Sequence, residues 1–149
     1  MRTLALALAV VGAAGCDSRN AISDPYAFPT PSSWQVARIN GVSAPSDGDR
    51  VIGTVHFDGR ELSGFGACNR YGGTYSAQQG ESVGNGFGVT GLSATEMYCG
   101  AALHPFEERM FDALRTVSSW RTEANGRLVL LGQGAEMELL PMLVAGGEG

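Results

Sequence analysis

Lysine is absent from this 149-residue chain, and only two histidines and three cysteines are present. Positive charge is therefore carried by ten arginines, which fifteen aspartates and glutamates outnumber. An acidic chain with so few cations is poorly suited to binding nucleic acid or anionic lipid by charge. We expect no nucleic-acid partner and no electrostatic attachment to a membrane.

The chain also lacks an apolar run of about 20 residues, the length that a membrane-spanning helix requires. A shorter run follows Arg2, covers residues 4–15 and has the length of a signal-peptide core. It ends in Ala13-Ala14-Gly15-Cys16, which resembles a bacterial lipobox in which Ala13 replaces the usual leucine. We expect residues 1–15 to be removed as a lipoprotein signal peptide and Cys16 to carry the lipid. An ordinary secretory signal is the alternative.

A lipid on Cys16 would also fix the compartment. Two or more acyl chains hold a protein stably on a membrane, so we expect a lipid-anchored protein of the cell envelope that faces the periplasm. Asp17 follows the lipidated cysteine, a position that in some enteric bacteria retains lipoproteins in the inner membrane. Because that sorting rule varies between lineages, the choice between inner and outer membrane stays open.

Assigning Cys16 to lipid leaves Cys68 and Cys99 as an even pair in an oxidising compartment. A disulfide is the natural assignment, and closing a loop of about thirty residues contributes roughly 3.5 kcal/mol in the chain-entropy account. Two buried free thiols are the alternative. No third ligand group stands at metal-binding spacing near either cysteine, so we expect no metal site and no cofactor.

Composition divides the chain into a tether, one domain and a tail. Residues 16–32 are rich in proline and small polar side chains, which bury too little surface to fold, and we expect a disordered tether there. Residues 33–143 are expected to form the domain, and the glycine-rich residues 144–149 a flexible tail.

Most of the domain has the alternating pattern of strands, separated by turns that contain glycine. The expected strands are residues 34–39, 51–57, 61–65, 71–77, 87–92, 120–123, 127–131 and 135–140. Asp58-Gly59 predicts a tight hairpin, and Asn125-Gly126 predicts a second hairpin. In the last strand, Met137 and Leu139 should face one way while the glutamates beside them face the other.

Residues 104–117 break this pattern, because their apolar side chains recur at helical spacing. Pro105 suits the first helical position, and Glu107 and Glu108 favour the positive end of the helix dipole. The apolar stripe needs a sheet to cover. We therefore predict a mainly β (α+β) fold, either a small, strongly bent antiparallel sheet or a lipocalin-like partial barrel, with one helix packed on it.

Two motifs resemble a known family. Residues 64–75 read G-x-G-x-C-N-x-Y-x-G-x-Y, and residues 95–99 read T-x-M-x-C. Together with the first strand and the helix, they resemble the META domain, the family of the bacterial heat-shock protein HslJ, over roughly residues 33–140. The resemblance implies a compact lipocalin-like or mixed β structure, a lipoprotein of the envelope, and a link to heat and antibiotic stress without general enzymatic activity.

Carried over residue by residue, the motifs give Cys68, Asn69, Tyr71, Gly73, Thr95, Met97 and Cys99. We interpret these residues first as architecture, because an asparagine can bond the backbone of its own turn and a tyrosine can be half-buried with its hydroxyl at the rim. A shared polar site of Asn69, Tyr71 and Thr95 near the disulfide is the functional alternative.

The sequence contains no catalytic constellation. It has no Cys-x-x-Cys motif, and His104 with Glu107 is too weak a pattern for a metal site. We expect a monomeric, non-catalytic protein with a binding or stress-response role, whose partner is an envelope protein or a small ligand. One alternative is an inhibitor of an envelope hydrolase that acts through the loop 78–86 or the His104 region. A less favoured one is a thiol enzyme that uses Cys68.

Overall fold

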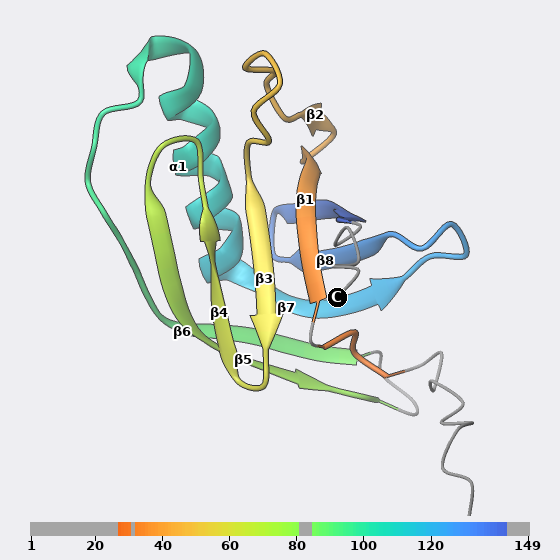
Figure 1. Cartoon of the computed structure of the whole chain (residues 1–149). Coiled ribbons are helices and arrows are strands. Elements are labelled where there is room, and N and C mark those ends of the chain that lie inside the picture. The colour runs from red at the N-terminus through yellow and green to blue at the C-terminus, as the bar shows by residue number, and fades with distance from the viewer. Residues whose placement is uncertain (1–26, 31, 81–84, 143–149) are drawn as a thin grey trace, which may run out of the picture.

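The computed structural model describes residues 27–30, 32–80 and 85–142 (Figure 1). Its strands are β1 (Ser32–Ile39), β2 (Val42–Ser43), β3 (Thr54–Asp58), β4 (Glu61–Phe65), β5 (Arg70–Gln78), β6 (Asn85–Ala94), β7 (Val117–Thr122), β8 (Leu128–Gly132) and β9 (Ala135–Pro141), and helix α1 (Gly100–Thr116) joins β6 to β7. The expected signal peptide, Cys16 and the tail 144–149 lie outside the described residues. In the part of the chain that the structure describes, no helix is long and apolar enough to cross a membrane.

Eight of these strands form a closed antiparallel barrel. From β3 to β9 each strand pairs with the next along the chain, β3 also pairs with β1, and β9 returns to pair with β1. The two-residue β2 only extends one edge of β1. The prediction of a mainly β, lipocalin-like fold with one helix is confirmed, and the pairing of the first strand with the last closes the sheet.

Turn chemistry and alternation set the strands as expected. Gly59 has φ +59 in the two-residue turn that joins Asp58 to Glu61, so the predicted β3–β4 hairpin is confirmed. In β9, Met137 and Leu139 are fully buried while Glu136 is exposed. The alternation thus identifies the barrel interior.

The helix begins earlier than predicted. It starts at Gly100, directly after Cys99, and Pro105 lies inside it, so the placement of Pro105 at the first helical position was wrong. Pro105 cannot donate to the carbonyl of Ala101, but the loss is a single bond near the helix start. The helix ends at Thr116, and Val117, also predicted as helical, opens β7.

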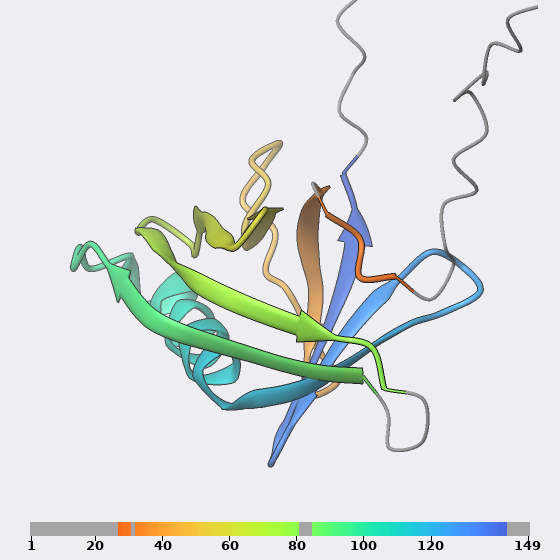
Figure 2. The ribbon, with the colours of Figure 1, turned by 90° about the horizontal axis from the view of Figure 1, so that it is seen from below.

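Helix α1 covers one end of the barrel. Among the described residues β6 and β7 pair only through Asn85 and Gly86, and beyond these pairs the strands diverge with α1 between them (Figure 2). One face of the helix is buried against the barrel through Phe106, Glu107, Met110, Phe111, Ala113 and Leu114. We call this end, where the β4–β5 connection and the start of α1 also lie, the motif end.

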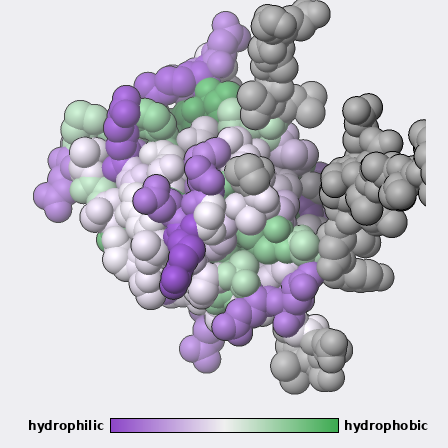
Figure 3. All heavy atoms as spheres, turned by 60° about the horizontal axis from the view of Figure 1, so that its bottom comes forward, coloured by the Kyte–Doolittle hydropathy of each residue, from purple (hydrophilic) through white to green (hydrophobic). Residues whose placement is uncertain are grey.

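The opposite end, which we call the aromatic end, is filled by rings. The ring of Phe28 lies 5.0–5.5 Å from the rings of Phe57, Tyr75, Phe87 and Trp120. Phe28 and Ser32 were expected in the tether, so the structured part extends N-terminal of the boundary predicted at residue 33. Figure 3 looks toward this end and shows small apolar patches between hydrophilic side chains.

Candidate functional site at the motif end

A disulfide ties the β4–β5 connection to the start of the helix. Cys68 is bonded to Cys99, with their Cα atoms 5.7 Å apart, which confirms the predicted pairing. Cys99 occupies the N-cap position of α1 but makes no side-chain capping bond. The bridge thus fixes where the helix begins relative to the sheet.

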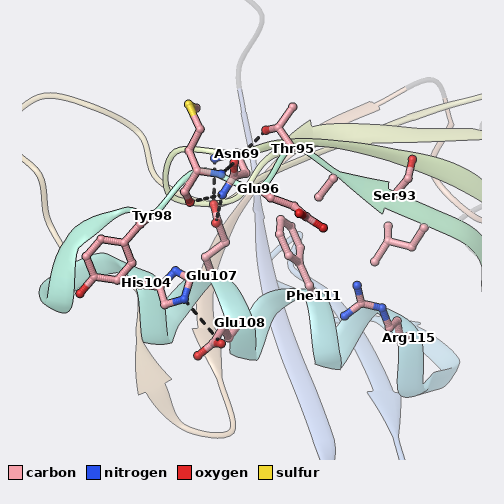
Figure 4. A pocket seen from close by; sticks show the side chains of 13 residues that line it. Asn69, Ser93, Thr95, Glu96, Tyr98, His104, Glu107, Glu108, Phe111 and Arg115 are labelled. Carbon is pink, nitrogen blue, oxygen red and sulfur yellow. Dashed lines mark hydrogen bonds and ion pairs between the residues drawn. The ribbon is translucent and has the colours of Figure 1, made fainter.

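Asn69 lies beside the bridge and is 3% exposed. Its Oδ1 accepts hydrogen bonds from Thr95 Oγ1 at 2.8 Å and from the Met97 amide at 2.7 Å. Its Nδ2 donates to the Met97 carbonyl at 2.8 Å and to Glu107 Oε1 (Figure 4). The side chain therefore uses its full bonding capacity to connect the loop after β6 with the helix.

Glu107 is the centre of the site and is 2% exposed. Its Oε2 accepts the backbone amides of Ala67, Cys68 and Asn69 at 2.7, 3.0 and 2.9 Å. Three successive amides that converge on one oxygen form an anion-binding concavity, and here the anion is a side chain of the same chain. Cys99 Sγ lies 3.3 Å from Glu107 Oε1.

These hydrogen bonds decide the charge of Glu107. Burial raises the pKa of the carboxyl group, but the bonds from the Asn69 side chain and from the amides of Asn69, Cys68 and Ala67 outweigh it and hold the pKa below its ordinary value. Glu107 is therefore a buried carboxylate that the turn around Cys68 stabilises.

Our sequence interpretation missed this residue. Glu107 was assigned to the helix dipole, whereas it lies outside the first turn of α1 and faces the sheet. The signal was present, because Glu107, Phe111 and Leu114 stand at i, i+4 and i+7 and so share one helix face. A charged residue on the apolar stripe indicates a buried partner, here the amides that follow the second motif glycine.

The motif glycines make room for the site. A Cβ on Gly66 would overlap the Glu107 carboxylate and would lie 2.6 Å from its Cγ, and a Cβ on Gly64 would overlap the Thr54 carbonyl. Only glycine lets the backbone approach this closely. These contacts explain the G-x-G that precedes Cys68 in the motif.

The predicted site residues fall into two groups. Cys68, Asn69, Thr95, Met97 and Cys99 lie together, and Thr95 Oγ1 also accepts the Arg70 amide at 3.1 Å. Tyr71 and Gly73 stand apart on β5. The Tyr71 hydroxyl donates to the Thr54 carbonyl at 2.7 Å, burial raises its pKa, and its ring packs 5.3 Å from that of Phe111. Gly73 faces the backbone of residues 90–92 on β6.

The atoms at metal-ligand spacing among the described residues belong to Cys68, Cys99 and Glu107 and lie within 4.8 Å of one another. The two sulfurs are bonded to each other and Oε1 already accepts a bond from Asn69. Cys68, Cys99 and Glu107 therefore form a structural bridge between the β4–β5 connection and α1. His104 instead faces Glu108 across 3.6 Å and packs its ring 5.0 Å from that of Tyr98.

Two hollows flank this network. A groove of about 610 Å³ runs between the end of β6 and α1, and a second hollow of about 460 Å³ lies on the other side of Cys68. Four large apolar side chains stand exposed around them, namely Val51, Phe65, Met97 and Tyr98. We call these four residues the apolar rim.

Comparison with known proteins identifies the family. The META domain matches residues 29–142, which is most of the chain and agrees with the resemblance in the motifs. The NMR structure of a protein from Burkholderia xenovorans is similar at a TM-score of 0.59 and 22% identity, covers 76% of this chain and 83% of its own, and shows the same fold. No curated protein matches. The chain belongs to the META domain family.

Proposed function

We propose that this protein is a non-catalytic binding domain of the bacterial cell envelope that is anchored by a lipid on Cys16 and holds a partner protein at its motif end. The observation that carries the proposal is that polar and apolar side chains point in opposite directions at the motif end. The polar motif groups point inward and are satisfied, whereas Met97 and Tyr98 are 56% and 71% exposed. Apolar patches of this kind, bordered by polar residues, are typical of protein interaction sites.

Glu107 and Cys68, the motif-end groups that could act as a base or a nucleophile, are already engaged. A general base needs a lone pair that can reach a substrate, and a nucleophilic cysteine needs its thiolate. Glu107 is buried and accepts four hydrogen bonds, and Cys68 is bonded to Cys99. This arrangement supports a scaffold that holds the apolar rim in place.

The anchor and the apolar rim would lie at opposite ends of the domain. The described segment before β1 lies at the aromatic end, and the segment before α1 lies at the motif end (Figure 1). A tether from Cys16 would therefore reach the aromatic end and leave the apolar rim pointing away from the membrane. Cys16→Ala should leave an unprocessed precursor without lipid. Unchanged membrane attachment and mature mass would contradict the anchor.

Site-specific photocrosslinking of the membrane-anchored chain tests the binding role. We expect a benzophenone side chain at Tyr98 to capture one envelope protein, and a second change, Met97→Ser, to reduce that capture. A benzophenone at Arg121, which is exposed on β7, is the matched control. Equal products from both positions would contradict the proposal.

The identity of the captured protein separates the remaining alternatives. An envelope hydrolase whose activity falls on binding would make the domain an inhibitor, the alternative that the sequence left open. A partner that is captured only after heat or antibiotic treatment would favour a stress-response role.

A further inference from the structure

One edge of β6 is open beside the helix. The strand spans Asn85–Ala94 but pairs with β7 only through its first two residues, and among the described residues no strand lies against this edge beyond them. The Thr95 amide donates to the Arg70 carbonyl at 3.0 Å, on the β5 side. Alternation then turns the backbone groups of Ala94 and Leu92 toward the open edge. Such an edge is a template for another strand.

A bulge lies within this open edge, just before the stretch that borders the groove. Gly91 has φ +64, and Gly91 and Leu92 together stand opposite Gly73, so β6 carries one extra residue there. A bulge bends its strand and turns the next side chains in a new direction. The stretch that borders the groove begins at Leu92 and runs into the loop after β6.

Charged and apolar side chains follow one another in a fixed order along the groove between this edge and α1. Glu108, Phe111 and Arg115 line it from the helix, at i, i+3 and i+7 (Figure 4). Glu96 adds a second carboxylate from the loop after β6, and Leu92 adds apolar surface from the strand. Along the helix the groove is therefore acidic, then apolar, then basic.

We propose that an extended segment of the partner protein adds to β6 in this groove as a further strand. Its side chains would complement the groove, with a basic residue toward Glu96 and Glu108, an aliphatic residue over Phe111, and an acidic residue toward Arg115. Main-chain bonds would supply affinity and the alternate side chains specificity. The inference deepens the proposed function, because it names the kind of partner segment that reaches the motif end.

The spacing of the groove fits a strand. At about 1.5 Å of rise per residue, Glu108 and Arg115 are about 10 Å apart along α1. An extended chain covers that length in three to four residues at about 3.3 Å each, and every second side chain points the same way. In a segment of the form basic-x-aliphatic-x-acidic the two charged residues are four steps, or about 13 Å, apart, and the long side chains of Glu108 and Arg115 can span the difference.

The test uses the full chain and a fluorescent peptide with the core Arg-Thr-Leu-Thr-Glu, together with its reversed sequence because the strand could add in either direction. We expect one of them to bind saturably and to slow the hydrogen exchange of the Leu92 and Ala94 amides. Ala94→Pro removes a donor on the open edge and leaves the β5 side paired, so binding should weaken at least about tenfold. A peptide of equal composition, with its charges moved to the other face, is the control.

A charge exchange keeps the test decisive if Ala94→Pro fails to fold. Glu108→Arg should weaken the Arg-containing peptide by about tenfold, and a peptide with Glu in place of that Arg should recover binding to this variant. Exposed Arg109 on the same helix supplies the matched variant Arg109→Glu, which should leave binding unchanged.

Three results of the peptide experiment would overturn the inference. In the first, neither peptide binds saturably. In the second, a folded Ala94→Pro variant binds as well as the unaltered chain. In the third, the Leu92 and Ala94 amides are already protected from exchange in the free chain, which would show that a segment of the same chain or a second copy lies on the edge. Capture from position 98 that survives Ala94→Pro would leave the proposed function standing and this inference refuted.

Discussion

The motif end and the aromatic end of the barrel are closed by opposite means. At the motif end, one carboxylate accepts three backbone amides and one side-chain amide, and a disulfide joins the same turn to α1. At the aromatic end, Phe28 fills the opening through ring contacts, and the buried Tyr75 hydroxyl has no partner among the described residues. Directional bonds fix one geometry, whereas ring packing tolerates adjustment.

We expect a substitution at the motif end to lower stability more than a substitution at the aromatic end. Removing the carboxylate leaves several buried donors without a partner at once, and each such donor is penalised separately. Removing a ring leaves a cavity that its neighbours can partly fill. The largest losses of stability should therefore come from changes at the motif end.

Glu107→Ala should lower the free energy of unfolding by about 4 kcal/mol, because it leaves the amides of residues 67–69 and the Asn69 side chain without their acceptor. Urea denaturation measures the change. Glu108→Ala is the matched control. The Glu108 side chain is next in sequence but 66% exposed, so its removal should change the free energy of unfolding by less than about 0.5 kcal/mol. Equal effects of the two changes would remove the basis for calling the motif end polar and rigid.

Reducing the Cys68–Cys99 disulfide should lower the free energy of unfolding by roughly 3.5 kcal/mol, since the bridge closes a loop with a sequence separation of 31 residues. Denaturation with and without reductant measures the difference, and the double change to serine should match the reduced protein. Coincident unfolding midpoints would show that Glu107 and Asn69 hold this end without the bridge.

Phe28→Ala should lower the free energy of unfolding by about 2 kcal/mol, less than for a fully buried phenylalanine because Phe28 is only half-buried. Fluorescence of Trp120, whose ring it contacts at 5.1 Å, should report the change locally. Exposed Thr30→Ala is the control. If the two variants unfold alike, Phe28 rests on the barrel without closing it.

Acid should loosen the motif end first. The folded pKa of Glu107 lies below its ordinary value of 4.5, so its ionised form stabilises the fold above that pH, and the contribution is lost as pH falls through the folded pKa. Stability measured against pH should therefore decline below about pH 4.5 less steeply in Glu107→Gln than in the unaltered chain. Parallel curves would mean that other carboxyl groups dominate the acid response.

Local patterns predicted most of the fold. The β3–β4 hairpin followed from Asp58-Gly59 and from alternation, because both act between near neighbours in sequence. The start of α1 did not follow, since the bridge at Cys99 lets the helix begin before Pro105. Closure of the barrel also did not follow, because no local pattern shows that β9 meets β1.

The candidate site was predicted in part. The motifs indicated Cys68, Asn69, Thr95 and Cys99, and Thr95 does bond Asn69, but they gave no acidic partner for the asparagine. Glu107 lies 38 residues beyond Asn69, and only the fold brings the two together. A charged residue on an otherwise apolar helix stripe was the one sign of it in the sequence.

The pairing of β1 with β9 constrains the order in which the molecule can assemble. Val36 pairs with Leu139, and the Met142 amide donates to the Ser33 carbonyl at 2.9 Å. A growing chain can form the other hairpins as they emerge, but it cannot close the ring until the last strand has been synthesised. Contacts between distant parts of a sequence form slowly, so one edge of β1 stays unpaired until β9 is present. A chain that ends before β9 would keep that edge exposed to aggregation.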